Sequence, residues 1–240
     1  MEQEVLKDWQ KKVMALVAST PELDHFYLTG GTALSGYYLQ HRVSDDLDFF
    51  TQDDFDLLFI EKFISKIKEQ LNASSVRFSR LYDRNQYFFM IGAEENKIEF
   101  TKYPFKQINP PEKRDGVFVD SEYDIAVNKL ITLVERFDPK DFVDLYFLLA
   151  KYPLLELKND VQKKFGYTLD PIFLGAELSK VKRVEDVGDA WLDAGIVMFS
   201  TINYLNDKIN VVDQPPLIVS LRGAFPSDEA ISGQVTVTFQ

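Results

Sequence analysis

The run from Phe26 to Phe50, FYLTGGTALSGYYLQHRVSDDLDFF, decides the fold. It starts with a short apolar strand, which leads into Gly30 and Gly31, and a short helix follows the glycines. Glycines let a phosphate approach the backbone closely, and the free N–H groups at a helix start favour an anion. Taken alone, a strand followed by two glycines is more often a plain turn, so phosphate binding needs further support.

The end of the same run adds two carboxylates, Asp46 and Asp48. Side chains alternate along a strand, so both carboxylates should share one face while Leu47 and Phe49 face the core. Two acids on an apolar strand are costly unless a cation lies between them. Mg²⁺ would meet that need and would also hold a triphosphate. The alternative is that both acids face solvent on a half-exposed strand.

A third acid, Glu99, lies in a second strand-like stretch, Lys97 to Thr101. Ile98 and Phe100 should face the core, which leaves Glu99 on the opposite face. If this strand neighbours the one with the two aspartates, Glu99 completes a carboxylate triad. It would then bind the metal or help to deprotonate an attacking hydroxyl. An ordinary exposed glutamate is the alternative.

A second polar block follows in the helical half of the chain. Lys129 and Arg136 are seven residues apart and share a helix face, so they could neutralise phosphate groups. Asp141 and Asp144 share a face near a helix start. A structural explanation competes, because Asp141 suits the first turn and Lys140 can pair with Asp144 one turn away. Spacing alone favours that structural explanation.

Composition narrows the chemistry. The 240 residues carry a net charge of −11, no cysteine and two histidines. A disulfide framework, a thiolate zinc site and a cysteine nucleophile are therefore excluded, and oxygen-liganded ions are favoured. The acidic balance argues against a passive nucleic-acid coat but is compatible with an enzyme that has a local basic patch. No apolar run reaches the ~20 residues of a membrane span and no signal peptide is evident, so a cytoplasmic protein without a membrane partner is expected.

The periodicity predicts an α+β protein in three parts. A mixed sheet flanked by helices should occupy residues 1–118, a helical region that completes the active site should occupy 119–212, and the tail 213–240 has no clear structure. Helices are expected at 3–18, 54–72, 121–136, 139–151, 154–165, 170–181 and 190–208. Strands are expected at 26–28, 47–50, 76–78, 87–91 and 97–103.

The sequence resembles the nucleotidyltransferase AbiEii/AbiGii toxin family. The resemblance rests on Gly30 to Leu34, on Arg42 to Phe50 (RVSDDLDFF), and on Lys129 and Arg136 followed by Lys140 to Tyr146 (KDFVDLY). It covers about residues 24–150. The family belongs to the polymerase-β-like nucleotidyltransferase superfamily, which implies a mixed sheet flanked by helices at the N-terminal end of the chain.

The resemblance also implies roles for particular residues. Two Mg²⁺ ions, with Mn²⁺ as the alternative, would be held by Asp46, Asp48 and Glu99. The catalytic set would be completed by Lys129, Lys140 and Asp144. The nucleotide would contact Gly30, Gly31, Thr32, Arg42, Ser44, Arg136 and Asp141. Glu99 stands where many relatives in the superfamily have aspartate, which puts its role as a metal ligand in doubt.

The expected reaction is the transfer of an NMP from an NTP to an acceptor hydroxyl. By resemblance the acceptor is a tRNA or another RNA, and the protein is the toxin of a toxin–antitoxin or phage-defence pair with a cognate antitoxin. Two alternatives stay open. One is a transferase acting on a cationic small molecule of the aminoglycoside type, which suits the acidic balance but not the Lys140–Tyr146 block. The other is a non-catalytic nucleotide-binding module.

Overall fold

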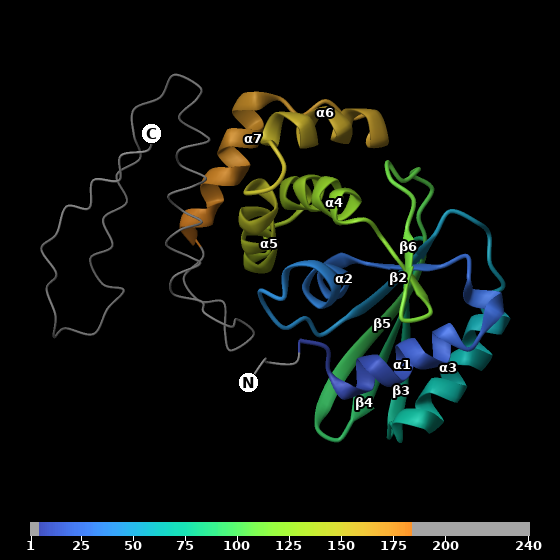
Figure 1. The fold of residues 1–240 in the computed structure, drawn as a ribbon. Helices are drawn as coiled ribbons and strands as arrows, with labels where there is room; N and C mark the ends of the chain where they lie inside the picture. Colours follow the sequence, from blue (N-terminus) through green and yellow to red (C-terminus); the bar gives the residue numbers. More distant parts are fainter. Residues whose placement is uncertain (1–4, 184–240) are drawn as a thin grey trace, which may run out of the picture.

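The computed structural model describes residues 5–183 of the chain. Their centre is a seven-stranded mixed sheet in the order β3-β4-β5-β2-β1-β7-β6 (Figure 1). The strands are β1 Tyr27–Thr29, β2 Leu47–Thr51, β3 Ser75–Leu81, β4 Arg84–Ile91, β5 Glu94–Lys102, β6 Glu112–Arg114 and β7 Val117–Val119. Strand β2 runs antiparallel to β1 and parallel to β5, so the sheet is mixed as predicted.

Helices cover both faces of this sheet. The α-helices are α1 Asp8–Ala18, α2 Gly30–Leu34, α3 Leu57–Leu71, α4 Glu122–Glu135, α5 Pro139–Leu149, α6 Leu154–Phe165 and α7 Pro171–Leu178. A π-helical turn, Ser35–Leu39, extends α2, and 3₁₀ turns occupy Pro21–Leu23 and Ser179–Arg183. Helices α1 and α3 lie on one side of the sheet, and α4 to α7 gather on the other (Figure 1). The α+β class is confirmed.

Two expected segments lie outside the described residues, namely the helix at 190–208 and the tail at 213–240. The predicted boundary at 118 falls within β7, because that strand ends at Val119, one residue beyond the boundary. The division into parts stays a prediction.

Alternation along β2 and β5 places their apolar side chains in the core as predicted. Leu47, Phe49, Ile98 and Phe100 are all fully buried, and the rings of Phe49 and Phe100 stack with their centroids 5.3 Å apart. Each such side chain contributes about 1.5–3 kcal/mol to stability by leaving water. The register pairs Asp48 with Glu99, so the polar side chains of the two strands lie side by side on the other face.

Local caps and a buried ion pair stabilise the helical half. Ser121 caps α4 by accepting a bond from the Asp124 N–H, and Asp138 caps α5 ahead of Pro139. The Lys164 ammonium on α6 lies 2.7 Å from the Asp124 carboxylate on α4, and both groups are buried. The ion pair joins α6 to α4.

Across the part of the chain that the structure describes, none of the helices combines the length and the apolar character that crossing a membrane requires.

Candidate active site

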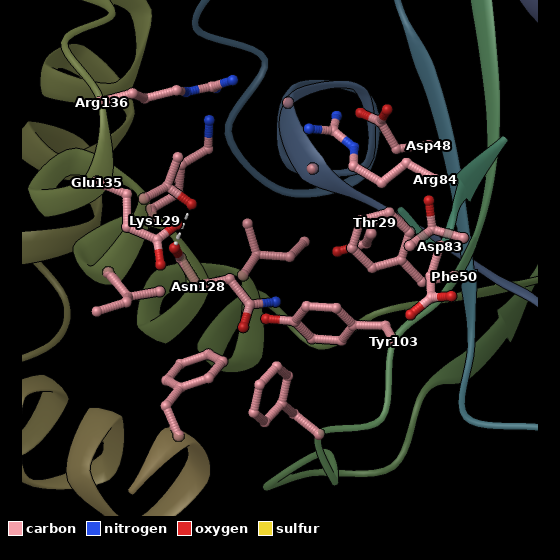
Figure 2. A pocket seen from close by; sticks show the side chains of 18 of the residues that line it. Thr29, Asp48, Phe50, Asp83, Arg84, Tyr103, Asn128, Lys129, Glu135 and Arg136 are labelled. Atoms are coloured by element: carbon pink, nitrogen blue, oxygen red, sulfur yellow. Dashed lines mark hydrogen bonds between the residues drawn. The ribbon is translucent and has the colours of Figure 1, made fainter. Parts of the chain in front are cut away.

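A cavity of about 880 Å³ lies between the polar face of the sheet and the helices beyond it (Figure 2). The sheet side contributes Gly30, Gly31, Asp46, Asp48, Arg84 and Lys97. The helical side contributes Asn128, Lys129, Glu135 and Arg136. Figure 2 shows Lys129, from the middle of α4, and Arg136, at the C-terminal end of α4, across from Asp48 and Arg84. Part of each block that the sequence singled out therefore lies at this cavity, with Asp46 and Asp48 on one wall and Lys129 and Arg136 on the other.

The glycine pair is required by the close approach of polar side chains. Gly30 has φ +72°, in the left-handed region, and a Cβ there would lie 2.8 Å from Oδ2 of Asp48. A Cβ on Gly31 would overlap the guanidinium of Arg42 and would lie 3.0 Å from Oγ of Ser44. Glycine is the only residue without this conflict. The turn thus presents bare backbone to the cavity, directly beside a carboxylate.

A lysine lies among the three predicted acids. The Nζ atom of Lys97 is 3.0 Å from Oδ2 of Asp46, 3.3 Å from Oδ1 of Asp48 and 3.5 Å from Oε2 of Glu99. The charges of Asp48, Asp46 and Glu99 raise the pKa of Lys97 above its ordinary value, although burial opposes this. Alternation along the strand puts Lys97 on the same face as Glu99, although the sequence alone assigns it no role. The signal available was its position two residues before Glu99 on one strand.

Glu99 is held by a set of hydrogen bonds from its own sheet. The Arg84 guanidinium donates to both carboxylate oxygens at 2.7 and 2.8 Å, the Gln86 amide donates at 3.0 Å, and the Thr101 hydroxyl donates at 2.7 Å. Burial would raise the pKa of Glu99, but the bonds from Arg84 and Gln86 lower it to about 2. Glu99 is therefore ionised at neutral pH, and its oxygens are already engaged by donors.

The donor set fits a divalent ion at two of the three acids. Within residues 5–183, no group of three or more acids or histidines is arranged to hold a metal. Asp46 and Asp48 still offer the hard oxygen atoms that Mg²⁺ prefers, and a cation, the Lys97 ammonium, already lies between them. Glu99 differs from the expectation, because Arg84 holds it in a bidentate ion pair. Asp46 and Asp48 are therefore the acids that could hold a metal ion, whereas the oxygens of Glu99 are engaged by the sheet.

A second ionic cluster lies buried behind the glycine turn, around Asp144 of α5. The fully buried carboxylate of Asp144 accepts bonds from Nε and Nη2 of Arg42 at 2.7 and 2.8 Å and contacts Nε2 of His41 at 2.7 Å. The Lys129 ammonium lies 2.6 Å from both Asp144 and Asp141. Burial would raise the pKa of Asp144, but the charges of Lys129 and Arg42 hold it well below its usual range.

Comparison with known proteins decides the family. Residues 14–174 match the family described as "Nucleotidyl transferase AbiEii toxin, Type IV TA system", which is more than half of the chain. The chain belongs to the AbiEii nucleotidyltransferase toxin family. Membership makes it an NTP-dependent nucleotidyltransferase, as the two motif blocks predicted.

The chain is also similar to a curated protein and to two solved structures. An uncharacterised protein, aq_aa25 of Aquifex aeolicus (strain VF5), is 36% identical over 166 residues, which are 67% of this chain and 76% of that protein. The crystal structure of JHP933 from Helicobacter pylori gives a TM-score of 0.53 at 18% identity, covering 85% of this chain and 91% of that one. A putative nucleotidyltransferase from H. pylori gives 0.52 at 18% identity, covering 86% and 96%. At such identities the two structures support the fold alone.

Several residues that the AbiEii resemblance assigned to the nucleotide lie behind the cavity instead. Thr32, Arg42 and Ser44 are buried, and none of them lines the cavity. The Thr32 hydroxyl donates to the backbone carbonyl of Asp46, and the buried Gln10 amide donates to the carbonyl of Ser44 at 2.8 Å. These side chains therefore support the glycine turn and the aspartate strand, and do not offer polar groups to a ligand.

The second block is divided in the same way. Lys129 and Arg136 line the cavity, although Lys129 is itself largely buried, and the buried Asp141 pairs with both of them. Lys140 lies 3.7 Å from Asp45, so the expected one-turn pair with Asp144 is not formed. The reason is that Asp144 points inward, where Arg42, His41 and Lys129 already occupy its oxygens. Lys140 therefore lies outside the cavity.

Asp120, at the end of β7, was not singled out from the sequence, and it should make stability depend on pH. Burial raises its pKa to about 6, with a smaller contribution from Asp124, while bonds from Thr29 and Gln107 oppose the rise. A raised carboxyl pKa means that the fold prefers the neutral form, so stability should fall as pH rises from about 4 to about 6. Asp120→Asn should remove this fall and add at most about 3 kcal/mol at pH 8.

Urea unfolding of both proteins at several pH values checks this prediction. The difference in free energy of unfolding between variant and wild type isolates Asp120 from the other titrating groups. Parallel profiles between pH 4 and pH 7 would contradict it.

Proposed function

We propose that the protein transfers an NMP from an NTP to a hydroxyl group of an RNA, with tRNA as the acceptor, and that it acts as a toxin. The observation that carries the proposal is the cavity itself. Bare backbone at Gly30 and Gly31 and the carboxylates of Asp46 and Asp48 lie on one wall, and Lys129 and Arg136 lie on the other. This combination supplies metal ligands and phosphate-binding cations in one place.

The reaction assigned to this cavity is an in-line displacement. The acceptor hydroxyl oxygen forms a bond to the α-phosphorus, the bond from that phosphorus to the bridging oxygen breaks, pyrophosphate leaves, and the hydroxyl proton passes to solvent. A divalent ion at Asp46 and Asp48 would supply charge stabilisation for the phosphate oxygens. Lys129 and Arg136 would attract the triphosphate, and the glycine turn would let it approach the backbone. Glu99, ionised and bonded to Arg84, would hold the sheet side of the cavity in place.

The remaining end of the cavity suits a nucleobase. Tyr103, Phe105 and Phe165 line it, with the rings of Phe105 and Phe165 centred 4.8 Å apart and those of Tyr103 and Phe105 5.1 Å apart. Aromatic faces bind bases by stacking, without strong preference for one base. Asn128 lines the same cavity, and its buried Oδ1 atom has no hydrogen-bond partner in the described structure. It is an acceptor for a base amino group.

The charge around the cavity favours an anionic ligand over an aminoglycoside. Four acids line the cavity, Asp46, Asp48, Asp83 and Glu135, against five bases, Arg84, Lys97, Lys102, Lys129 and Arg136. The chain as a whole carries −11. The bulk acidity therefore lies elsewhere, and a polycation would gain little attraction here. This balance supports an RNA acceptor. The toxin family adds the more specific proposals that the acceptor is a tRNA in the cytoplasm and that a cognate antitoxin is a partner.

Labelled NTPs test the proposal. The full chain, with Mg²⁺, is incubated with each α-³²P-labelled NTP and with total RNA, purified tRNA or aminoglycosides in separate reactions. Label should appear in tRNA and should disappear when EDTA is added. Label on an aminoglycoside would overturn the acceptor assignment. Nucleotide binding by calorimetry with no labelled acceptor in any reaction would support the non-catalytic alternative.

A further inference from the structure

We propose that Lys97 is a resident cation of the site, which competes with the divalent ion for the carboxylates of Asp46 and Asp48. The inference rests on the proposed function, because it concerns the metal that the reaction would use. The ammonium of Lys97 lies 3.0 and 3.3 Å from the two aspartates, at the position between two carboxylates where a cation relieves their repulsion most.

The partners of the three acids separate the role of Lys97 from that of Arg84. Glu99 keeps its bidentate contact with Arg84 and its bonds from Gln86 and Thr101 whether or not Lys97 is present. Within the part of the chain that the structure describes, Lys97 is the only ion-pair partner of Asp46 and of Asp48. Loss of the lysine charge would therefore leave these two aspartates, and not Glu99, without a cation.

The Lys97 side chain is only 16% exposed, and carboxylates of Asp46, Asp48 and Glu99 surround its ammonium. A divalent ion that binds Asp46 and Asp48 must therefore displace the ammonium from its place between them. The flexible four-carbon stem lets the ammonium move away while it stays within the cavity, where triphosphate oxygens would accept it. The free protein should thus bind the ion weakly, and nucleotide should strengthen that binding.

Direct metal binding tests the proposal without any transfer reaction. Mn²⁺ is titrated into the full chain, free of nucleotide, and followed by calorimetry and by the electron paramagnetic resonance signal of free Mn²⁺. Lys97→Met should bind Mn²⁺ about tenfold or more tightly than wild type, because the competing charge is gone. Added Mn²⁺ should also raise the melting temperature of Lys97→Met more than that of wild type.

Lys102→Met is the matched control. Lys102 lies on the same strand and lines the same cavity, but it pairs with exposed Asp54. The Lys102→Met variant loses the same charge but keeps the surroundings of Asp46 and Asp48. Its Mn²⁺ affinity should therefore stay within about threefold of wild type. Lys97→Gln serves as a second variant if Lys97→Met does not fold.

The outcomes separate the two proposals. Unchanged or weaker Mn²⁺ binding in both Lys97 variants would overturn the role of Lys97 and leave the proposed transfer intact. An equal gain in Lys102→Met would also overturn it, because the effect would then be one of net charge. If wild type and Lys97→Met bind no Mn²⁺ and no NTP label is transferred, the proposed function fails together with the inference.

Discussion

Asp48→Asn is expected to reduce NMP transfer by about a thousandfold or more while the protein stays folded. Asp48 lies beside the bare backbone of Gly30, so its carboxylate is next to the place assigned to the triphosphate. Asparagine has nearly the same shape but no charge, and it therefore binds a divalent ion much more weakly. The change removes the interaction that should be strongest when negative charge builds up on the transferring phosphate.

The same substitution should not weaken the fold. Burial raises the pKa of Asp48, and the charges of Glu99 and Asp46 add to this, while Lys97 opposes it. The ionised carboxylate is thus less favourable in the folded protein than in the unfolded chain at neutral pH. A neutral amide should keep or raise the melting temperature, as is common where a site is charged for function.

Labelled-NTP kinetics and thermal unfolding of the same preparation measure both effects. Asp45→Asn is the matched control, because Asp45 adjoins the motif but is 46% exposed and contacts only Lys7 and Lys140 among described ion-pair partners. It should retain transfer within a few-fold of wild type. Wild-type transfer by Asp48→Asn would remove Asp48 from the reaction.

The sequence predicted the strand side of this site because alternation fixes which side chains share a face. Leu47 and Phe49 on one strand and Ile98 and Phe100 on the other could face only the core, which left Asp48 and Glu99 on the other side. The pairing of the two strands was conditional in the sequence, and the register confirms it.

The partners of those acids could not be predicted in the same way. Arg84 starts β4 in a polar stretch, Arg84-Asn85-Gln86, which has no apolar alternation and was left outside the expected strand at 87–91. Its contact with Glu99 depends on the β4–β5 register, in which it pairs with Thr101. The three-residue strands β6 and β7 were not expected from the sequence.

The buried cluster behind the glycine turn was still harder to predict, because Arg42 and Asp144 are about a hundred residues apart in the chain. Arg42 belongs to the family motif, and the resemblance assigns it to the nucleotide. In the structure its guanidinium is buried and donates to the carboxylate of Asp144. Nothing in local spacing distinguishes an arginine that binds phosphate from one that fixes a turn. The distinction lies in where α5 packs, which is a tertiary property.

Asp144→Ala should cost about 3–5 kcal/mol in free energy of unfolding, because it leaves buried cations without their partner. Arg42 is 2% exposed and would lose both of its bonds to the carboxylate, and His41 would lose its contact as well. Lys129 would keep its contact with Asp141, 2.6 Å away, so the loss falls mainly on the loop that carries Arg42. Arg42 packs against Gly31, so a looser loop would also disturb the glycine turn. Transfer should therefore fall as a consequence of the lost stability.

Urea unfolding at pH 7 measures the cost, with Asp24→Ala as the matched control. Asp24 is about half exposed and pairs with Lys113 at the surface, so its loss should cost less than about 1 kcal/mol. The double variant Arg42→Met with Asp144→Leu should be more stable than the sum of its single changes predicts, because neither charge is then buried alone. If Asp144→Ala unfolded like wild type and yet lost transfer, Asp144 would act on the reaction directly, as the family resemblance implies, and the structural role would be wrong.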